Sequence, residues 1–222
     1  MRTSHCPANL RRAGEDVRKR LLAHGFSEQR FGDDNPPAAH YQLLEARTRF
    51  FAEFLTPFKG SEYRRGGSRK ATKRILGVVS QQLRYLEILL ESPWSVDLDQ
   101  ANGFPLPGRR TIRVANPAGF LAYKVLNHQR RSRGKVAKDI LYIHDTLETF
   151  GSRWGDLHRE WQEHVMFLLR PRAVRTVERG TDKLFGEMND YVREAAQMAG
   201  GRKLTPEAIR EACHYGLEQV FG

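Results

Sequence analysis

The feature that most constrains the fold is a long succession of amphipathic helical segments in the C-terminal half of the 222-residue chain. Asn116-Pro117 is typical of a helix start, because the missing amide hydrogen of proline costs nothing in the first turn. Thr205-Pro206-Glu207 repeats this signal with a capping hydroxyl and an acid in the first turn. From residue 116 onward, apolar residues recur at spacings of three and four. These spacings predict helices over 116–131, 136–150, 154–168 (with Pro171 as its end) and 174–198, and from 206 onward.

The first 115 residues have a different pattern, in which short aromatic and branched runs are separated by turn residues. Glu53 lies within one such run on the same face as Phe51 and Leu55, because side chains alternate along a strand. A charged residue at the middle of a strand needs either solvent or a function. The pattern therefore predicts an α+β protein, with a mixed region over 1–115 and a helical region over 116–222. The expected helices of the mixed region are 10–23 and 81–90, and its expected strands are 41–48, 50–56, 96–98 and 111–114.

Several classes of protein are excluded by composition. The chain has no apolar run near the roughly 20 residues that a membrane-spanning helix needs. Its first residues lack the apolar core of a signal peptide, so the expected location is the cytoplasm. Cys6 and Cys213 lie at opposite ends of the chain, and we expect two unpaired thiols in a reducing compartment.

Basic residues exceed acidic residues, and the formal net charge is +11. Such a charge attracts polyanions such as RNA, DNA, nucleotides or an acidic membrane surface, without choosing among them. Much of it falls in a predicted loop over 61–74, which is a candidate contact for RNA or another anionic acceptor. The alternative is a solvated loop on an arginine-rich surface that has no such role. The basic residues of this loop are Arg64, Arg65, Arg69, Lys70, Lys73 and Arg74.

Common catalytic motifs are absent from the sequence: there is no Walker-type phosphate loop, dinucleotide fingerprint, zinc-protease helix or paired cysteine motif. Asp97 and Asp99 form the best local carboxylate pair for a divalent metal. Two aspartates beside a proline-rich turn are more typical of turn and capping residues, so the capping interpretation is preferred.

A third group of residues surrounds the predicted junction between helices 116–131 and 136–150. Two helices joined by a short basic loop would bring these side chains to one place, where they would suit a triphosphate or a nucleic-acid backbone. The alternative is that these residues only cap the helix ends and carry solvated charge. The group consists of Lys124, Arg130, Arg131, Lys138 and Asp139.

Four segments in this order and spacing resemble the nucleotidyltransferase-fold proteins of the polymerase-β-type superfamily. The first resembles the family strand that carries the third metal carboxylate and ends in Leu-Thr-Pro. The second is similar to the helix after a variable loop, the third to a strand–Pro–helix unit ending in a nucleotide-side lysine, and the fourth to an Arg-Arg and Lys-Asp turn. The segments are Phe51–Pro57, Gly77–Glu87, Ile112–Lys124 and Gln129–Ile140.

This resemblance implies a partial nucleotidyltransferase sheet and a metal-dependent transfer of a nucleotidyl group from a nucleoside triphosphate to an acceptor. It makes Glu53 a catalytic metal ligand, with Mg²⁺ as the implied ion. It also makes Lys124 and the residues from Arg130 to Asp139 a nucleotide-binding group. Two divalent ions would stabilise the attacking and leaving oxygens of an in-line displacement.

The sequence departs from the family pattern before Glu53, where a Gly-Ser helix start and a strand with Asp-x-Asp are expected. Asp33 and Asp34 are adjacent and would point to opposite sides of an extended chain. We therefore expect a truncated or degenerate member, active only if the missing motif is supplied. The alternative function is non-catalytic binding of nucleic acid or a partner through the basic loops. A protein partner or a second copy could also cover an exposed edge of the partial sheet.

Overall fold

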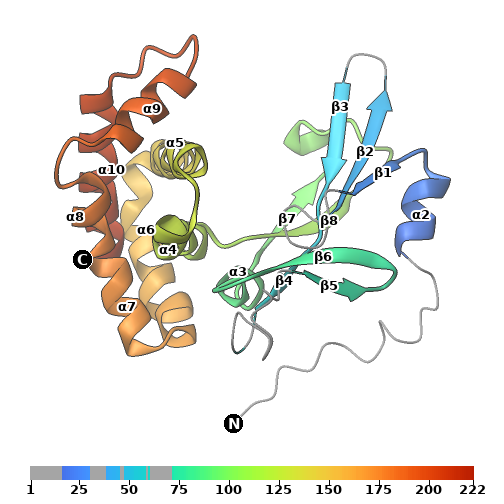
Figure 1. Cartoon of the computed structure of the whole chain (residues 1–222), viewed down its shortest axis with the longest axis horizontal. Coiled ribbons are helices and arrows are strands. Elements are labelled where there is room, and N and C mark those ends of the chain that lie inside the picture. The colour runs from blue at the N-terminus through green and yellow to red at the C-terminus, as the bar shows by residue number, and fades with distance from the viewer. Residues whose placement is uncertain (1–16, 31–38, 46–47, 59, 61–71) are drawn as a thin grey trace. The chain divides into compact units, whose positions relative to one another are not determined.

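The computed structural model describes residues 17–30, 39–45, 48–58, 60 and 72–222. It confirms an α+β protein, with most strands in the first half of the chain and helices in the second (Figure 1). The chain divides into two compact units, and the boundary in the sequence falls between Arg84 and Tyr85. The strand pair expected over 96–98 and 111–114 therefore belongs to the second unit.

The first unit contains one described helix, α2 (Val17–Ala23), and two small sheets. One sheet is antiparallel with the order β1-β2-β3, and the other has β6 between parallel β4 and antiparallel β5. Tyr41 and Val78 are buried in a core that also receives Leu21 of α2. The strands are β1 (Ser27–Arg30), β2 (Ala39–Glu45), β3 (Thr48–Ala52), β4 (Leu55–Pro57), β5 (Thr72–Ile75) and β6 (Val78–Leu83).

The helix expected over 81–90 is wrong in its first part. Residues 81–83 belong to β6, and only α3 (Glu87–Leu90) is helical. A two-residue turn, Leu76-Gly77, joins β5 to β6, and both residues have positive φ, at 50° and 78°. This is the pattern of a primed hairpin turn, whose twist matches that of the paired strands.

Two further expectations for the first unit need correction. Glu53 is not at the middle of a strand, because β3 ends at Ala52 and β4 begins at Leu55. The expected alternation holds across this break, since Phe51, Glu53 and Leu55 are all exposed. Lys73 and Arg74 are not loop residues but belong to β5, an edge strand, on which both are exposed. Arg64, Arg65, Arg69 and Lys70 of the predicted basic loop lie outside the described residues.

The second unit combines an antiparallel strand pair with a bundle of helices (Figure 1). Short 3-10 turns cover Gln100–Asn102, His128–Arg130, Gly151–Arg153 and Met166–Leu168, and a π-helical turn covers Trp161–Val165. The regular elements after α3 are β7 (Trp94–Leu98), β8 (Arg110–Val114), α4 (Pro117–Asn127), α5 (Arg133–Phe150), α6 (Trp154–Glu160), α7 (Pro171–Glu178), α8 (Gly180–Phe185), α9 (Asp190–Met198) and α10 (Pro206–Phe221).

Helix α10 packs against α5, α6, α8 and α9 through one buried face. Trp161 and Phe221 are both buried and meet edge to face, with ring centroids 4.8 Å apart. Gly216 allows a close approach to α5, since a Cβ there would lie 2.9 Å from Leu147. Burial of this many apolar side chains, at roughly 25 cal/mol per Å² of apolar surface, is what holds the helices together.

The predicted helix starts are confirmed by their caps. Asn116 Oδ1 accepts hydrogen bonds from the amides of Ala118 (2.9 Å) and Gly119 (3.3 Å). Thr205 Oγ1 accepts one from the amide of Ala208 at 3.1 Å. Pro171, by contrast, does not end a helix but is the first residue of α7, where its missing donor is harmless.

Helix α8 meets α4 at Gly180, which is buried. A Cβ at this position would overlap Cγ1 of Val125. The two backbones therefore approach as closely as they do only because residue 180 has no side chain. Within the described part of the chain, no helix has both the length and the apolar character to cross a bilayer.

Candidate functional site

The main candidate site is an ion-paired cluster between α4 and α5. Lys124 Nζ lies 2.5 Å from Asp139 Oδ1, and Arg131 Nη1 lies 3.0 Å from Asp139 Oδ2. The side chains of Lys124 and Asp139 are only 8% and 4% exposed, while that of Arg131 is 24% exposed. Two cations thus share one buried carboxylate, and the cluster keeps a net positive charge that faces solvent through Arg131.

Aromatic rings surround the two cations. Lys124 Nζ lies 4.9 Å from the ring centroid of Phe120 and 4.7 Å from that of Tyr142. The guanidinium of Arg131 lies 5.9 Å from the ring centroid of Tyr123 and 3.5 Å from its hydroxyl oxygen. Such cation–π contacts partly replace the water that a buried cation loses.

The cluster also perturbs proton affinities. Burial lowers the pKa of Lys124, and the neighbouring Asp139 carboxylate opposes that shift. Burial raises the pKa of the Tyr123 hydroxyl, while Arg131 opposes that change. The Asp139 carboxylate therefore favours the charged form of the buried ammonium.

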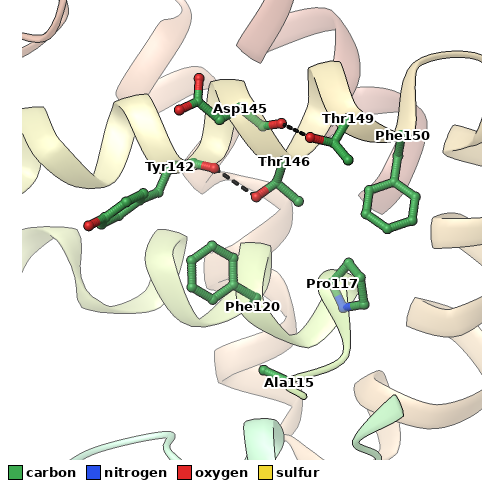
Figure 2. Close-up of a pocket in the computed structure, with 8 residues that line it drawn as sticks. All are labelled: Ala115, Pro117, Phe120, Tyr142, Asp145, Thr146, Thr149 and Phe150. Atoms are coloured by element: carbon green, nitrogen blue, oxygen red, sulfur yellow. Dashed lines mark hydrogen bonds between the residues drawn. The ribbon is translucent and has the colours of Figure 1, made fainter. Parts of the chain in front are cut away.

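A pocket of about 340 Å³ opens beside this cluster, between α4 and α5 (Figure 2). Its walls are mainly apolar and include the rings of Phe120, Tyr142 and Phe150. Two hydroxyls on α5 also line it, and both already donate to backbone carbonyls: Thr146 to Tyr142 and Thr149 to Asp145. Each hydroxyl thus faces the pocket with only acceptor capacity left.

The sequence therefore predicted part of this cluster correctly. Lys124, Arg131 and Asp139 meet, and Lys138 joins them at the rim, with its Nζ 5.6 Å from the ring centroid of Tyr142. The side chain of Arg130 lies outside the described residues, although its backbone ends the 3-10 turn after α4. Their role in nucleotide binding stays a prediction.

The pocket wall on α5 was not predicted from the sequence. Tyr142, Thr146 and Thr149 are spaced by four and three residues, so they share one face of the helix. This face differs from that of Ile140, Ile143 and Leu147, which are buried. A second, aromatic and hydroxyl-bearing stripe on an otherwise amphipathic helix is the signal that could have identified it.

In the first unit, Glu53 has one neighbour of chemical interest. Its carboxylate lies 2.5 Å from Nε2 of His40, whose ring stacks on Phe51 with centroids 5.6 Å apart. Among the described residues, no group of three potential metal ligands includes Glu53. Glu53 is therefore one accessible carboxylate held beside an imidazole.

The pair Asp97 and Asp99 has structural roles, as the capping interpretation expected. Asp97 forms an ion pair with Arg109 and accepts a hydrogen bond from the Thr111 hydroxyl at 2.7 Å, which ties β7 to β8. Arg109 lowers the pKa of the Asp97 carboxyl. Asp99 accepts a hydrogen bond from the amide of Asn102 at 2.9 Å and caps the 3-10 turn.

Two other groups of potential metal ligands are ion-pair networks instead. In the first, His144, Asp145 and Glu148 surround Arg202, whose guanidinium binds Asp145 at 2.5 Å and lowers the pKa of its carboxyl. A guanidinium at that place competes with any metal ion.

In the second, the two ring nitrogens of His214 face different carboxylates. Nε2 lies 3.1 Å from Asp182, and Nδ1 lies 3.5 Å from Glu218. The imidazole therefore separates the two acids. In both groups the donor atoms lie within 4.8 Å of one another, and the acids are already paired with a guanidinium or an imidazole.

Cys213 is a buried thiol whose pKa burial raises, and it has no disulfide partner among the described residues. This agrees with the expected free thiol. Cys6 lies outside the described residues.

Comparison with known proteins identifies the family. No curated protein and no solved structure gives a significant match. A family model described as nucleotidyltransferase matches residues 7–166, which is more than half of the chain. The match contains Glu53, the cluster of Lys124, Arg131 and Asp139, and every residue that lines the pocket. The chain therefore belongs to this nucleotidyltransferase family.

Proposed function

We propose that this protein binds a nucleoside triphosphate beside α4 and α5 and transfers its nucleotidyl group to an acceptor with the help of a divalent metal. One observation carries the proposal: the region that matches the nucleotidyltransferase family contains a cationic cluster at the edge of an aromatic pocket. The pocket's volume of about 340 Å³ falls at the lower end of the range for small-molecule sites.

The base is assigned to the pocket. Phe120 and Tyr142 offer ring faces and edges for stacking, and their centroids are 6.4 Å apart. Because Thr146 and Thr149 have only acceptor capacity left, they favour a base with an exocyclic amino group. We therefore expect ATP, CTP or GTP to bind more tightly than UTP.

The phosphates are assigned to the rim. Arg131 and Lys138 are accessible there, and a guanidinium fork suits phosphate oxygens. Lys124 is too buried to move toward a ligand, so its part is to hold Asp139 and to keep the rim positive. The triphosphate would contact Arg131 and Lys138 first.

Glu53 is the residue proposed to bind the divalent metal ion. Glu53 is a single accessible carboxylate, which does not by itself form a resident site. Mg²⁺, however, commonly binds through one or two carboxylates together with substrate phosphates and water. Glu53 therefore has the chemistry of one such carboxylate ligand, the role that the family resemblance implies for it. When bound, such an ion would stabilise negative charge on the phosphates.

In the proposed reaction, a hydroxyl oxygen of the acceptor forms a bond to the α-phosphorus. The bond from that phosphorus to the bridging oxygen of the β-phosphate breaks, pyrophosphate leaves, and the hydroxyl proton passes to a base or water. Arg131 and Lys138 would hold the departing phosphates, and stacking in the pocket would orient the base. Orientation of this kind supplies much of the rate gain in phosphoryl-group transfer.

Calorimetric titration of the full chain with each of the four ribonucleoside triphosphates, with and without Mg²⁺, tests the proposal. We expect saturable, Mg²⁺-dependent binding that Glu53→Gln weakens and that Arg131→Gln combined with Lys138→Gln abolishes. Absence of saturable binding, or binding that survives the double change, would contradict it. Binding of RNA alone, steeply dependent on salt, would instead support non-catalytic nucleic-acid binding.

A matched pair of variants tests the pocket. Tyr142 lines it and Tyr191 lies on α9, and both are 40% exposed. Tyr142→Ala is expected to weaken triphosphate binding about tenfold, since stacking on an aromatic ring contributes about 1–3 kcal/mol per base. Tyr191→Ala should leave binding unchanged, and equal losses in the two variants would exclude the pocket.

A further inference from the structure

A second cationic surface lies on α7 and α8. Four basic side chains and Thr176 line a hollow of about 310 Å³ there. Arg179 separates the two helices but keeps right-handed helical backbone angles (φ −77°, ψ −15°), so α8 continues α7 closely. The spacings of three, four and four residues place the basic side chains on one face. We call this the cation face; it consists of Arg172, Arg175, Arg179 and Lys183.

The cations of this face have no acidic partner within the part of the chain that the structure describes. Among the residues that the structure describes, no ion pair or hydrogen bond involves any of the four basic side chains. Other arginines of the same unit do have carboxylate partners: Arg133 binds Glu194, Arg193 binds Asp190, and Arg202 binds Asp145. Like charges four residues apart destabilise a helix by a few tenths of a kcal/mol. The row of four cations therefore does not stabilise the helices that carry it.

The opposite face of these helices anchors them to the bundle. Ala173 and Val177 of α7 and Leu184 and Phe185 of α8 are all buried. The apolar side of the segment is therefore occupied by packing. The four cations are exposed, as are the acidic side chains of Glu178 and Asp182. A helix that binds a membrane surface needs a free apolar face to insert, and this segment has none.

The spacing of the cations points to a ligand with several phosphates in a row. Side chains three or four residues apart on a helix are about 5–6 Å from each other. From Arg172 to Lys183 the rise is about 16 Å, at 1.5 Å per residue. This is longer than one triphosphate, and guanidinium groups bind phosphates with two parallel hydrogen bonds.

We propose that the cation face binds the phosphate backbone of a single nucleic-acid strand. The face begins after residue 166, beyond the part of the chain that matches the nucleotidyltransferase family, and it is separate from the pocket between α4 and α5. The proposal concerns binding alone and stands whether or not the chain transfers nucleotides. If it does, a strand on this face is a natural acceptor.

Fluorescence anisotropy of the full chain with a labelled 12-nucleotide single-stranded RNA tests this assignment. The test variant is Arg175→Gln with Arg179→Gln. Its control is Arg153→Gln with Arg159→Gln, which removes the same charge from an exposed part of α6 and its preceding turn. We expect about tenfold weaker binding for the test variant, and a salt slope lower by about 1.4, because a single strand loses about 0.7 per phosphate contact. The control should stay within about twofold of the wild type.

Three outcomes would overturn the proposal. Equal losses in both variants would mean that overall charge, not this face, binds RNA. If phosphatidylserine vesicles displace the RNA, and only the test variant loses binding, the face would instead bind a membrane surface. Displacement by ATP at a concentration equal to that of RNA phosphate would indicate a site for free nucleotides. A thermal unfolding temperature of the test variant no lower than that of the wild type ensures that a loss of binding is not a loss of fold. Lys183→Gln, at the end of the face, should give a smaller loss of binding.

Discussion

The two cationic surfaces of the helical unit differ in what balances their charge. Between α4 and α5, Lys124 and Arg131 share the buried Asp139. On α7 and α8, the cation face is exposed and has no acidic partner in the described part of the chain. A buried cation must be compensated if the fold is to form, whereas an exposed cation is compensated by water.

This difference separates structural from binding roles. The Asp139 cluster joins two helices, so its residues affect stability whatever they bind. Among the described residues, no ion pair or hydrogen bond joins the charged groups of the cation face to the rest of the fold, so its residues should affect binding far more than stability. Measurements of unfolding free energy can therefore distinguish the two kinds of surface.

Asp139→Ala should destabilise the protein by about 3–5 kcal/mol, because it leaves Lys124 buried without its carboxylate. The control is Asp156→Ala, since Asp156 also binds two arginines but lies at the surface. That change should cost about 1 kcal/mol or less. Urea unfolding followed by circular dichroism measures both, and similar costs would mean that the Asp139 cluster is not buried in solution.

Gly180→Ala should destabilise by about 1–3 kcal/mol, because a methyl group would overlap Val125. Gly155 offers the matched control on α6, since a Cβ there meets nothing within 4 Å. Gly155→Ala should stabilise by up to about 1 kcal/mol through helix propensity. Differential scanning calorimetry should thus give shifts of opposite sign, and shifts of the same sign would contradict the close packing of α8 on α4.

The pH dependence of stability should report the buried ammonium. Because burial lowers the pKa of Lys124, the unfolded chain binds its proton more readily than the folded chain. Stability from this residue therefore rises as pH increases from the folded pKa toward the unfolded value near 10.4. Over that pH range, the unfolding free energy of the wild type should rise relative to that of Lys124→Met. A difference that does not change with pH would mean that Lys124 is solvated.

The smallest effect is expected on the cation face. Arg175→Gln with Arg179→Gln removes three like-charge pairs at spacings of three or four residues, so stability should rise by about 0.2–0.5 kcal/mol for each pair. Arg193→Gln removes an ion pair with Asp190 and should lower stability by a similar amount. Chemical denaturation at low salt gives the sign of each change. A loss of more than about 1 kcal/mol in the double variant would show that this face does have a structural partner.

The parts of the fold that the sequence predicted correctly rest on local chemistry. The helix starts at Asn116-Pro117 and Thr205-Pro206 depend on a side-chain oxygen that accepts from the first amides of its own helix, so the cap itself is local. The hairpin of β5 and β6 was missed for the opposite reason. Its turn has Leu76 at positive φ, where Asn or Gly is typical, and residues 81–83 are held in a strand by pairing with β4 and β5.

The candidate site was predictable to a similar degree. A short turn between two helices indicated that Lys124, Arg131 and Asp139 would meet, and they do. That the carboxylate would be buried and shared, and that rings of α4 and α5 would enclose a pocket, depends on how the helices pack. The role of Glu53 as a metal ligand stays a prediction.

The contact between Gly180 and Val125 has a consequence for distance. Val125 follows Lys124 directly on α4, and Gly180 follows Arg179 directly on the cation face. The packing of the Val125 side chain on the backbone of Gly180 therefore fixes the distance between the Asp139 cluster and the cation face. If a strand and a nucleotide bind at these two places, the spacing between them is set by the packing of these two helices rather than by a loop.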